Sequence, residues 1–152
     1  GKDFLSLAVA SRFVANETHA YSKQARLGSS RTALIDVFLS PRGAFQYLAP
    51  VFLLTSSQTA SAAETFTLAM RALPQVTIIG EATQGGFSDQ LDKRLSNGWR
   101  ASLANEFYLS SEGEEFETEG VPVDVEVPQL QREARLLGTD PGIDAVITML
   151  HQ

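Results

Sequence analysis

Residues 50–80, PVFLLTSSQTASAAETFTLAMRALPQVTIIG, contain the pattern that decides the fold. The apolar run VFLLT, with the composition of a strand buried on both faces of a sheet, precedes a polar turn. Apolar residues then recur at helical spacing until Pro74, and the apolar run VTIIG follows. A strand, a helix and a strand within about 30 residues form a βαβ unit, whose two strands are parallel. We therefore expect an α/β fold with a mostly parallel sheet.

The chain on either side of this unit contains further predicted elements. Residues 5–14 have one apolar face and predict an N-terminal helix that starts near Asp3. Asp140 and Pro141 predict the start of a closing helix. Strands are predicted for THAYSKQARL (18–27) and ALIDVFLS (33–40), and a C-terminal antiparallel hairpin for NGWRASLANEFYLS (97–110) and EEFETEG (114–120) around the turn SSEGE, with Trp99 as a core anchor beside it.

The composition narrows the class of protein. The chain has 152 residues, 43% of them hydrophobic, which suffices for one domain with a core and not for two. The net charge of −6 and the absence of a basic cluster in the sequence argue against binding to nucleic acid or anionic membranes. Without cysteine there are no disulfides, thiolate metal sites or cysteine nucleophiles. Two distant histidines give no metal-ligand spacing, so no metal or other cofactor is expected.

Ser61 lies between the first strand and the helix of the βαβ unit, and two interpretations fit this position. As an N-cap, it would form a capping box with Glu64. As a nucleophile, it would stand beyond the carboxyl end of a parallel strand, where open α/β sheets bind their ligands. The N–H groups of the first helical turn could there stabilise an oxyanion. Residue type and spacing alone favour the N-cap.

Four blocks of the sequence resemble a known family. In order, TSSQTASAAETFTLAM, VTIIGEATQGGFSD, SNGWR and EFETEGVPVDVEV resemble the catalytic domain of the tail-specific (C-terminal processing) serine peptidases. The resemblance runs from about Phe4 to Val127. It is closest to the branch that includes tricorn core protease and the repeats of interphotoreceptor retinoid-binding protein. It implies a Clp/crotonase-like fold, with residues 1–152 as a single domain that forms the C-terminal portion of the catalytic domain.

The resemblance also implies a function. Members of the family cleave unfolded or C-terminal peptide segments through an acyl-enzyme, so we expect polypeptide substrates and leave a homo-oligomer open. The relatives are mostly bacterial and exported, which implies a periplasmic or secreted location. The retinoid-binding relatives imply an alternative from another class, a non-catalytic binding module for apolar ligands.

Several residues take roles from the resemblance. Ser61 matches the serine of the S-A-x-E pattern and would be the nucleophile, and Ala62 would donate its N–H to the oxyanion hole. Gly1 is a weaker candidate for the last residue of the turn that holds the second oxyanion donor. The E-x-x-G-V-x-x-D pattern assigns Glu117 as the acidic member, with Glu119 as the alternative if the register shifts.

The general base expected for this chain differs from the lysine used in the main branch of the family. Gly86 stands where the processing peptidases carry a lysine, and the lysines of this chain lie elsewhere, so a Ser–Lys dyad is not expected. The tricorn-like branch uses a histidine upstream of the serine, in a segment that would precede Gly1. His19 and His151 are better interpreted as surface residues. We therefore expect the base to lie outside these 152 residues, which alone would be nearly inactive.

Overall fold

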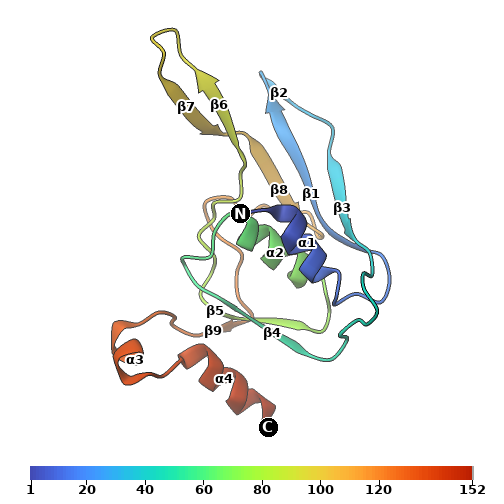
Figure 1. Cartoon of the computed structure of the whole chain (residues 1–152), viewed down its shortest axis with the longest axis vertical. Coiled ribbons are helices and arrows are strands. Elements are labelled where there is room, and N and C mark those ends of the chain that lie inside the picture. Colours follow the sequence, from blue (N-terminus) through green and yellow to red (C-terminus); the bar gives the residue numbers. More distant parts are fainter. Residues whose placement is uncertain (152) are drawn as a thin grey trace.

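The computed structural model describes residues 1–151, so Gln152, the last residue of the expected domain, lies outside the described chain. The centre of the fold is the predicted βαβ unit. Its two parallel strands are joined by a helix that packs on the sheet (Figure 1). A short third strand extends this sheet in parallel, in the order β4-β5-β9. The elements are β4 (Val51–Thr55), α2 (Ala62–Arg71), β5 (Val76–Gly80) and β9 (Val125–Glu126). The α/β class and the βαβ unit are confirmed.

A second sheet is antiparallel throughout. Its central strand, β1, pairs with β3 on one side and β8 on the other, and β2 pairs with its outer end. The bounds are β1 (Thr18–Leu27), β2 (Ser30–Arg31), β3 (Ile35–Leu39) and β8 (Glu106–Ser110). The prediction of a mostly parallel sheet was therefore wrong for the described strands. The connections between β1, β2 and β3 are only a few residues long, and such short connections join antiparallel neighbours only.

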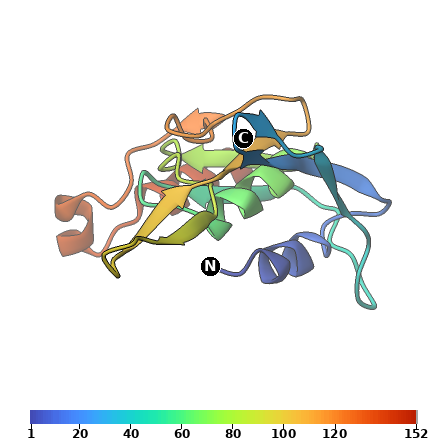
Figure 2. The ribbon, with the colours of Figure 1, turned by 90° about the horizontal axis from the view of Figure 1, so that it is seen from above.

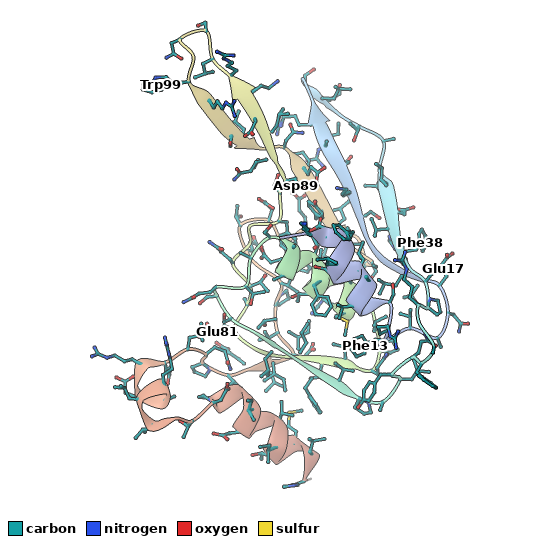
Figure 3. All side chains as sticks on the ribbon, in the orientation of Figure 1. Phe13, Glu17, Phe38, Glu81, Asp89 and Trp99 are labelled. Carbon is teal, nitrogen blue, oxygen red and sulfur yellow. The ribbon has the colours of Figure 1, made fainter. Side chains whose placement is uncertain are left out.

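The hairpin lies elsewhere than predicted. Strand β7 (Arg100–Ala104) pairs with β6 (Gln90–Arg94), whereas the run 114–120 contributes only an isolated bridge to β8. The Asn97-Gly98 turn, with Gly98 at a φ of 87°, explains this outcome because Asn-Gly is the stronger hairpin signal. Trp99 projects from the tip of the hairpin and is 73% exposed, so its assignment as a core anchor was wrong (Figure 3).

The core lies between α2 and the two sheets. The predicted N-terminal helix, α1 (Asp3–Ala10), packs against α2 and ends earlier than the apolar pattern suggested. Strand β4 is only half-buried, and Leu54 is 38% exposed, because β4 is an edge strand of its sheet. The prediction of burial on both faces was wrong for β4. The largest fully buried side chains include Tyr21, Leu39, Leu68, Met70, Ile78 and Ile79.

The last part of the chain forms two helices beside the parallel sheet (Figure 1). Helix α4 (Pro141–Leu150) begins as predicted, with the Asp140 carboxylate accepting two N–H groups of its first turn at 3.0 and 3.1 Å. Helix α3 (Arg132–Leu137) was not predicted, and it ends at Gly138 in the left-handed conformation. None of the helices in residues 1–151 combines the length and apolar character that a membrane span requires.

Candidate active site

Ser61 occupies a strained turn between β4 and α2. Its backbone has a φ of 57° and a ψ of −128°, a combination that a residue with a side chain rarely adopts and that is typical of functional sites. The turn is held by the Ser61 N–H, which donates to the Gly86 carbonyl at 3.1 Å and to the Glu64 carboxylate at 3.0 Å. The residue itself is exposed to solvent. The structure thus presents a serine at the mouth of a helix.

Both interpretations of Ser61 are partly fulfilled. The capping box with Glu64 is present, and its well-formed half is the bond from the Ser61 N–H to the Glu64 carboxylate. The other half is looser: the Ser61 side chain faces the Glu64 N–H but makes no cap hydrogen bond of normal geometry. Because the Ser61 hydroxyl makes no cap hydrogen bond of normal geometry to the helix, it is free to react.

Glu64 is the most deeply buried carboxylate at this site, with an exposed fraction of 0%. Besides the Ser61 N–H, it accepts the Thr83 hydroxyl at 2.7 Å and the N–H groups of Gly85 and Gly86 at 2.6 and 2.9 Å. Four donors compensate for the loss of hydration of a buried charge. Sequence analysis predicted only the capping box, because three of the four donors come from a loop about twenty residues further along the chain.

The loop of residues 85–88 is fastened by two carboxylates. Gly85 and Gly86 donate their N–H groups to Glu64, and Phe87 and Ser88 donate theirs to Glu117 at 3.1 and 3.2 Å. Four consecutive N–H groups are therefore satisfied, and the loop is fixed beside the Ser61 turn. A Cβ added at Gly86 would come no nearer than 3.8 Å to the atoms around it, so this position has room for a Cβ.

The segment 117–120 packs directly on this loop. The Thr118 N–H donates to the Gly85 carbonyl at 2.7 Å, and a Cβ at Gly85 would approach the backbone of 118–120 to within 3 Å. Glu117 is half-buried and uses Oε2 for its two backbone donors. Glu119 is exposed, and among residues 1–151 its side chain makes no hydrogen bond or ion pair. Glu117 thus fastens the loop, whereas the Glu119 carboxylate faces solvent.

Ala62 and Gly1 lie together at the entrance of α2. Among the described residues, the Ala62 N–H has no hydrogen-bond acceptor, as expected for a donor in the first helical turn. The Gly1 backbone is so close that a Cβ there would lie 2.4 Å from the Ala62 Cβ. An open, mainly apolar groove of about 460 Å³ begins here and is lined by Gly1, Lys2, Leu5, Ser6, Val9, Ala62, Ala63 and Phe66.

Neither histidine contacts the Ser61 turn. His19, on β1, lies with Nε2 2.9 Å from the Ser22 hydroxyl, which in turn donates to Asp36 at 2.6 Å. His151 is exposed at the end of α4. Lys23 is also engaged elsewhere, in an ion pair with Glu106 at 3.2 Å. Within residues 1–151 no group of three or more acidic or histidine side chains could hold a metal ion.

Glu81, which follows β5, gives a testable pH dependence. Its carboxylate accepts the Gln129 N–H at 2.9 Å and the N–H and hydroxyl of Ser57 at 3.1 and 3.0 Å. These bonds, the one from Gln129 foremost, hold the pKa of Glu81 below its ordinary value of 4.5.

Because the pKa of Glu81 is lower in the folded protein, the stabilisation by this carboxylate is present above pH 4.5 and is lost as the pH falls through the folded pKa. We expect Glu81→Gln to be less stable than the unaltered protein at pH 7 and the difference to shrink as the pH falls from 4.5 through the folded pKa. Urea unfolding over a series of pH values measures it, and an unchanged difference would contradict the assignment.

Comparison with known proteins identifies the family. The family model of peptidase family S41 matches residues 1–127. The chain belongs to peptidase family S41. The S41 match runs from α1 through β9 and ends before α3 and α4, and it confirms the resemblance stated from the four sequence blocks. No curated protein matches the chain.

Solved structures agree with the S41 assignment. A candidate peptidase from Parabacteroides merdae is 31% identical, with a TM-score of 0.88 over 99% of this chain and 48% of that one. The photosystem II D1 C-terminal processing protease is 21% identical, with a TM-score of 0.65 over 84% of this chain and 31% of that one. Tricorn protease is 23% identical, with a TM-score of 0.54 over 97% of this chain and 13% of that one. At these identities the last two show the fold alone. The chain spans about half or less of each protein.

Proposed function

We propose that this chain forms the C-terminal portion of the catalytic domain of a serine endopeptidase with a Clp/crotonase-like fold. Its substrates would be unfolded or C-terminal polypeptide segments, as for the tail-specific branch of the family, and its location bacterial and extracytoplasmic. The observation that carries the proposal is Ser61, whose exposed, uncommitted hydroxyl lies on a strained strand-to-helix turn beside the free N–H of Ala62.

The chemistry follows from this arrangement. Ser61 Oγ attacks the scissile carbonyl, and its proton passes to a base. We propose that the base is a histidine outside these 152 residues, because His19 is engaged on β1 and Gly86 has no side chain to act. The Ala62 N–H and the positive end of α2 stabilise the oxyanion. The protonated base then releases the amine product, and water hydrolyses the acyl-enzyme.

Covalent labelling tests the proposal. The full-length protein should react with a fluorophosphonate probe, and digestion followed by mass spectrometry should place the single modified residue at Ser61. Labelling should strengthen between about pH 6 and 9, where a histidine base becomes neutral. If the folded protein does not react anywhere in this range, or reacts at another serine, the peptidase proposal fails.

Glu117 and Glu119 differ in the hydrogen bonds that their carboxylates make. The motif favours Glu117, but its carboxylate already fastens the loop at Phe87 and Ser88. We propose that Glu119, whose carboxylate is free, orients the base. Glu119→Gln should then lower kcat by about 100-fold or more without changing the unfolding midpoint. Glu117→Gln should lower the midpoint as well. Equal rates for Glu119→Gln and the unaltered protein would return the orienting role to Glu117.

The apolar groove beside Ala62 favours one alternative, a binding module for apolar ligands. The groove is open, and its walls come from one face of α1 and the first turns of α2. If this is the function, a fluorescent fatty-acid analogue should bind and Leu5→Arg should abolish binding, while the fluorophosphonate leaves Ser61 unmodified. In a peptidase, the same groove would accept an apolar substrate side chain next to the scissile bond.

A further inference from the structure

The β6–β7 hairpin projects from the body of the molecule beside the β1–β2 end of the antiparallel sheet (Figure 1). Its two strands pair only with each other, and nearly all of its side chains are exposed. An isolated two-stranded hairpin is only marginally stable in water, and both of its outer edges leave backbone groups unpaired. Within the described residues the hairpin is therefore not held by core packing, and its surface is exposed there.

Near the tip of the hairpin, two arginines occupy opposed positions, which disfavours pairing of the two strands. Arg94 lies directly opposite Arg100 in the antiparallel register, and like charges in this position repel. Among residues 1–151 neither guanidinium has a carboxylate partner, and the nearby Asp92 is hydrogen-bonded to the Ser102 hydroxyl. Trp99, the only tryptophan of the sequence, is exposed and precedes Arg100 in the chain. Two opposed guanidinium groups without a carboxylate partner are suited to bind carboxylates.

The fold brings further cationic side chains, from the β1–β2 turn, to this end of the molecule. The Arg26 N–H donates to the Asn105 carbonyl at 2.8 Å, so the β1–β2 turn and the hairpin leave the antiparallel sheet at the same end. Residues 26–31 and 90–104, here called the basic end, contain the cations Arg26, Arg31, Lys93, Arg94 and Arg100 and a single carboxylate, Asp92. The chain as a whole has a net charge of −6. The basic end is therefore a local exception that attracts acidic ligands.

The hairpin is also continuous with the candidate active site. Strand β6 follows the loop 85–88, and the Ser88 hydroxyl at its base accepts the N–H groups of Asn105 and Glu106 at 2.8 and 2.9 Å. In Figure 2 the N-terminus lies between the hairpin and α1. Gly1 lies against Ala62, the residue after Ser61, so the N-terminus that Figure 2 shows between α1 and the hairpin is next to the candidate nucleophile.

We propose that the β6–β7 hairpin is a substrate-binding wall that selects extended polypeptide segments carrying acidic side chains. The inference rests on the proposed peptidase function. The substrate would pair its backbone with a free edge of the hairpin and place carboxylates at Arg94 and Arg100, with Trp99 providing apolar contact. Eight positions separate Gly86 from Arg94. At roughly 3.3 Å per residue this segment spans at most about 26 Å, which an extended peptide covers in eight residues or fewer, so the acidic residues should lie within that number of the scissile bond.

A peptide series tests the distance and the charge together. Peptides of one sequence would carry an Asp-Asp pair three, seven or eleven residues from the scissile bond, or Asn-Asn at the same place, and the full-length protein would be assayed at low and high salt. We expect the Asp-Asp peptide at about seven residues to have a kcat/KM about tenfold above its Asn-Asn counterpart, and the preference to fade with salt. The variant Arg94→Glu with Arg100→Glu should lose the preference.

The controls keep the two proposals separable. Arg132→Glu with Arg135→Glu changes the net charge equally on α3 and should retain the preference. Binding of the same labelled peptides to Ser61→Ala, read by fluorescence anisotropy, requires no cleavage. Charge-dependent binding to this variant, together with no cleavage by the unaltered full-length protein, would support the hairpin site and defeat the peptidase. Cleavage with no preference, a preference that survives the Arg94 and Arg100 changes, or a hairpin variant that only alters self-association would overturn the inference.

Discussion

Replacement of Ser61 by alanine should lower kcat for peptide cleavage by about four decades or more and leave the free energy of unfolding nearly unchanged. The loss of rate follows because removal of a serine nucleophile leaves only the catalysis that oxyanion stabilisation and binding provide. The stability should hardly change because the hydroxyl makes no cap hydrogen bond, and alanine at a φ of 57° has about the same strain as serine. Single-turnover cleavage and urea unfolding of the full-length protein measure the two quantities.

This pair of measurements separates the nucleophile from the N-cap. A serine that serves mainly as an N-cap loses about 1 kcal/mol of stability on replacement by alanine. Ser111→Ala, at an exposed position in the turn after β8, is the matched control and should change neither quantity. A Ser61→Ala protein that still cleaves peptides but unfolds about 1 kcal/mol more easily would show that Ser61 is a cap.

Replacement of Glu64 by glutamine should lower the free energy of unfolding by about 2 to 4 kcal/mol and slow labelling of Ser61. The change is nearly isosteric, but all four partners of the carboxylate are donors. A glutamine amide would direct its NH₂ group at one or two of these N–H groups and leave them buried without an acceptor. Since the same carboxylate holds both the Ser61 turn and Gly86, its loss should displace the nucleophile as well as destabilise the fold.

Three measurements define the role of Glu64. Urea unfolding gives the stability, hydrogen exchange reports whether the N–H groups of Gly85 and Gly86 become unprotected, and the fluorophosphonate reaction reports the alignment of Ser61. Glu81→Gln provides the comparison, because Glu81 also accepts three hydrogen bonds but lies near the surface, and it should cost less stability and leave the labelling rate unchanged. Unchanged exchange and stability in Glu64→Gln would show that the loop is held by other contacts.

The parts of the fold that were predicted correctly depend on local pattern. The βαβ unit, β1 and the start of α4 each follow from apolar periodicity or capping residues within a short window. The hairpin was placed wrongly because two turn signals competed, and Asn97-Gly98 is the stronger one. The antiparallel majority was missed because pairing depends on which distant strands meet, as when β8 joins β1 across more than 80 residues.

The same limit applies to the site. Ser61 could be singled out from its place after a strand, and the family pattern marked Glu117 and Ala62. The four donors of Glu64 could not be foreseen, because they are brought together by a turn in one segment and a loop in another. The basic end was missed for the same reason: its arginines are about 65 residues apart in the sequence and converge only when β1 and β8 pair.

The open space at Gly86 has an evolutionary consequence. The resemblance implies that related enzymes carry their catalytic lysine at this position, whereas this chain has a glycine. A Cβ added here would meet only the Glu64 carboxylate, at an ordinary contact distance, so neither crowding at the Cβ nor the backbone conformation enforces the glycine. If the base of this chain comes from elsewhere, as proposed, a loop of the same backbone could serve both kinds of base. The nucleophile and the carboxylate that fastens it would stay in place while the residue that activates the serine changed.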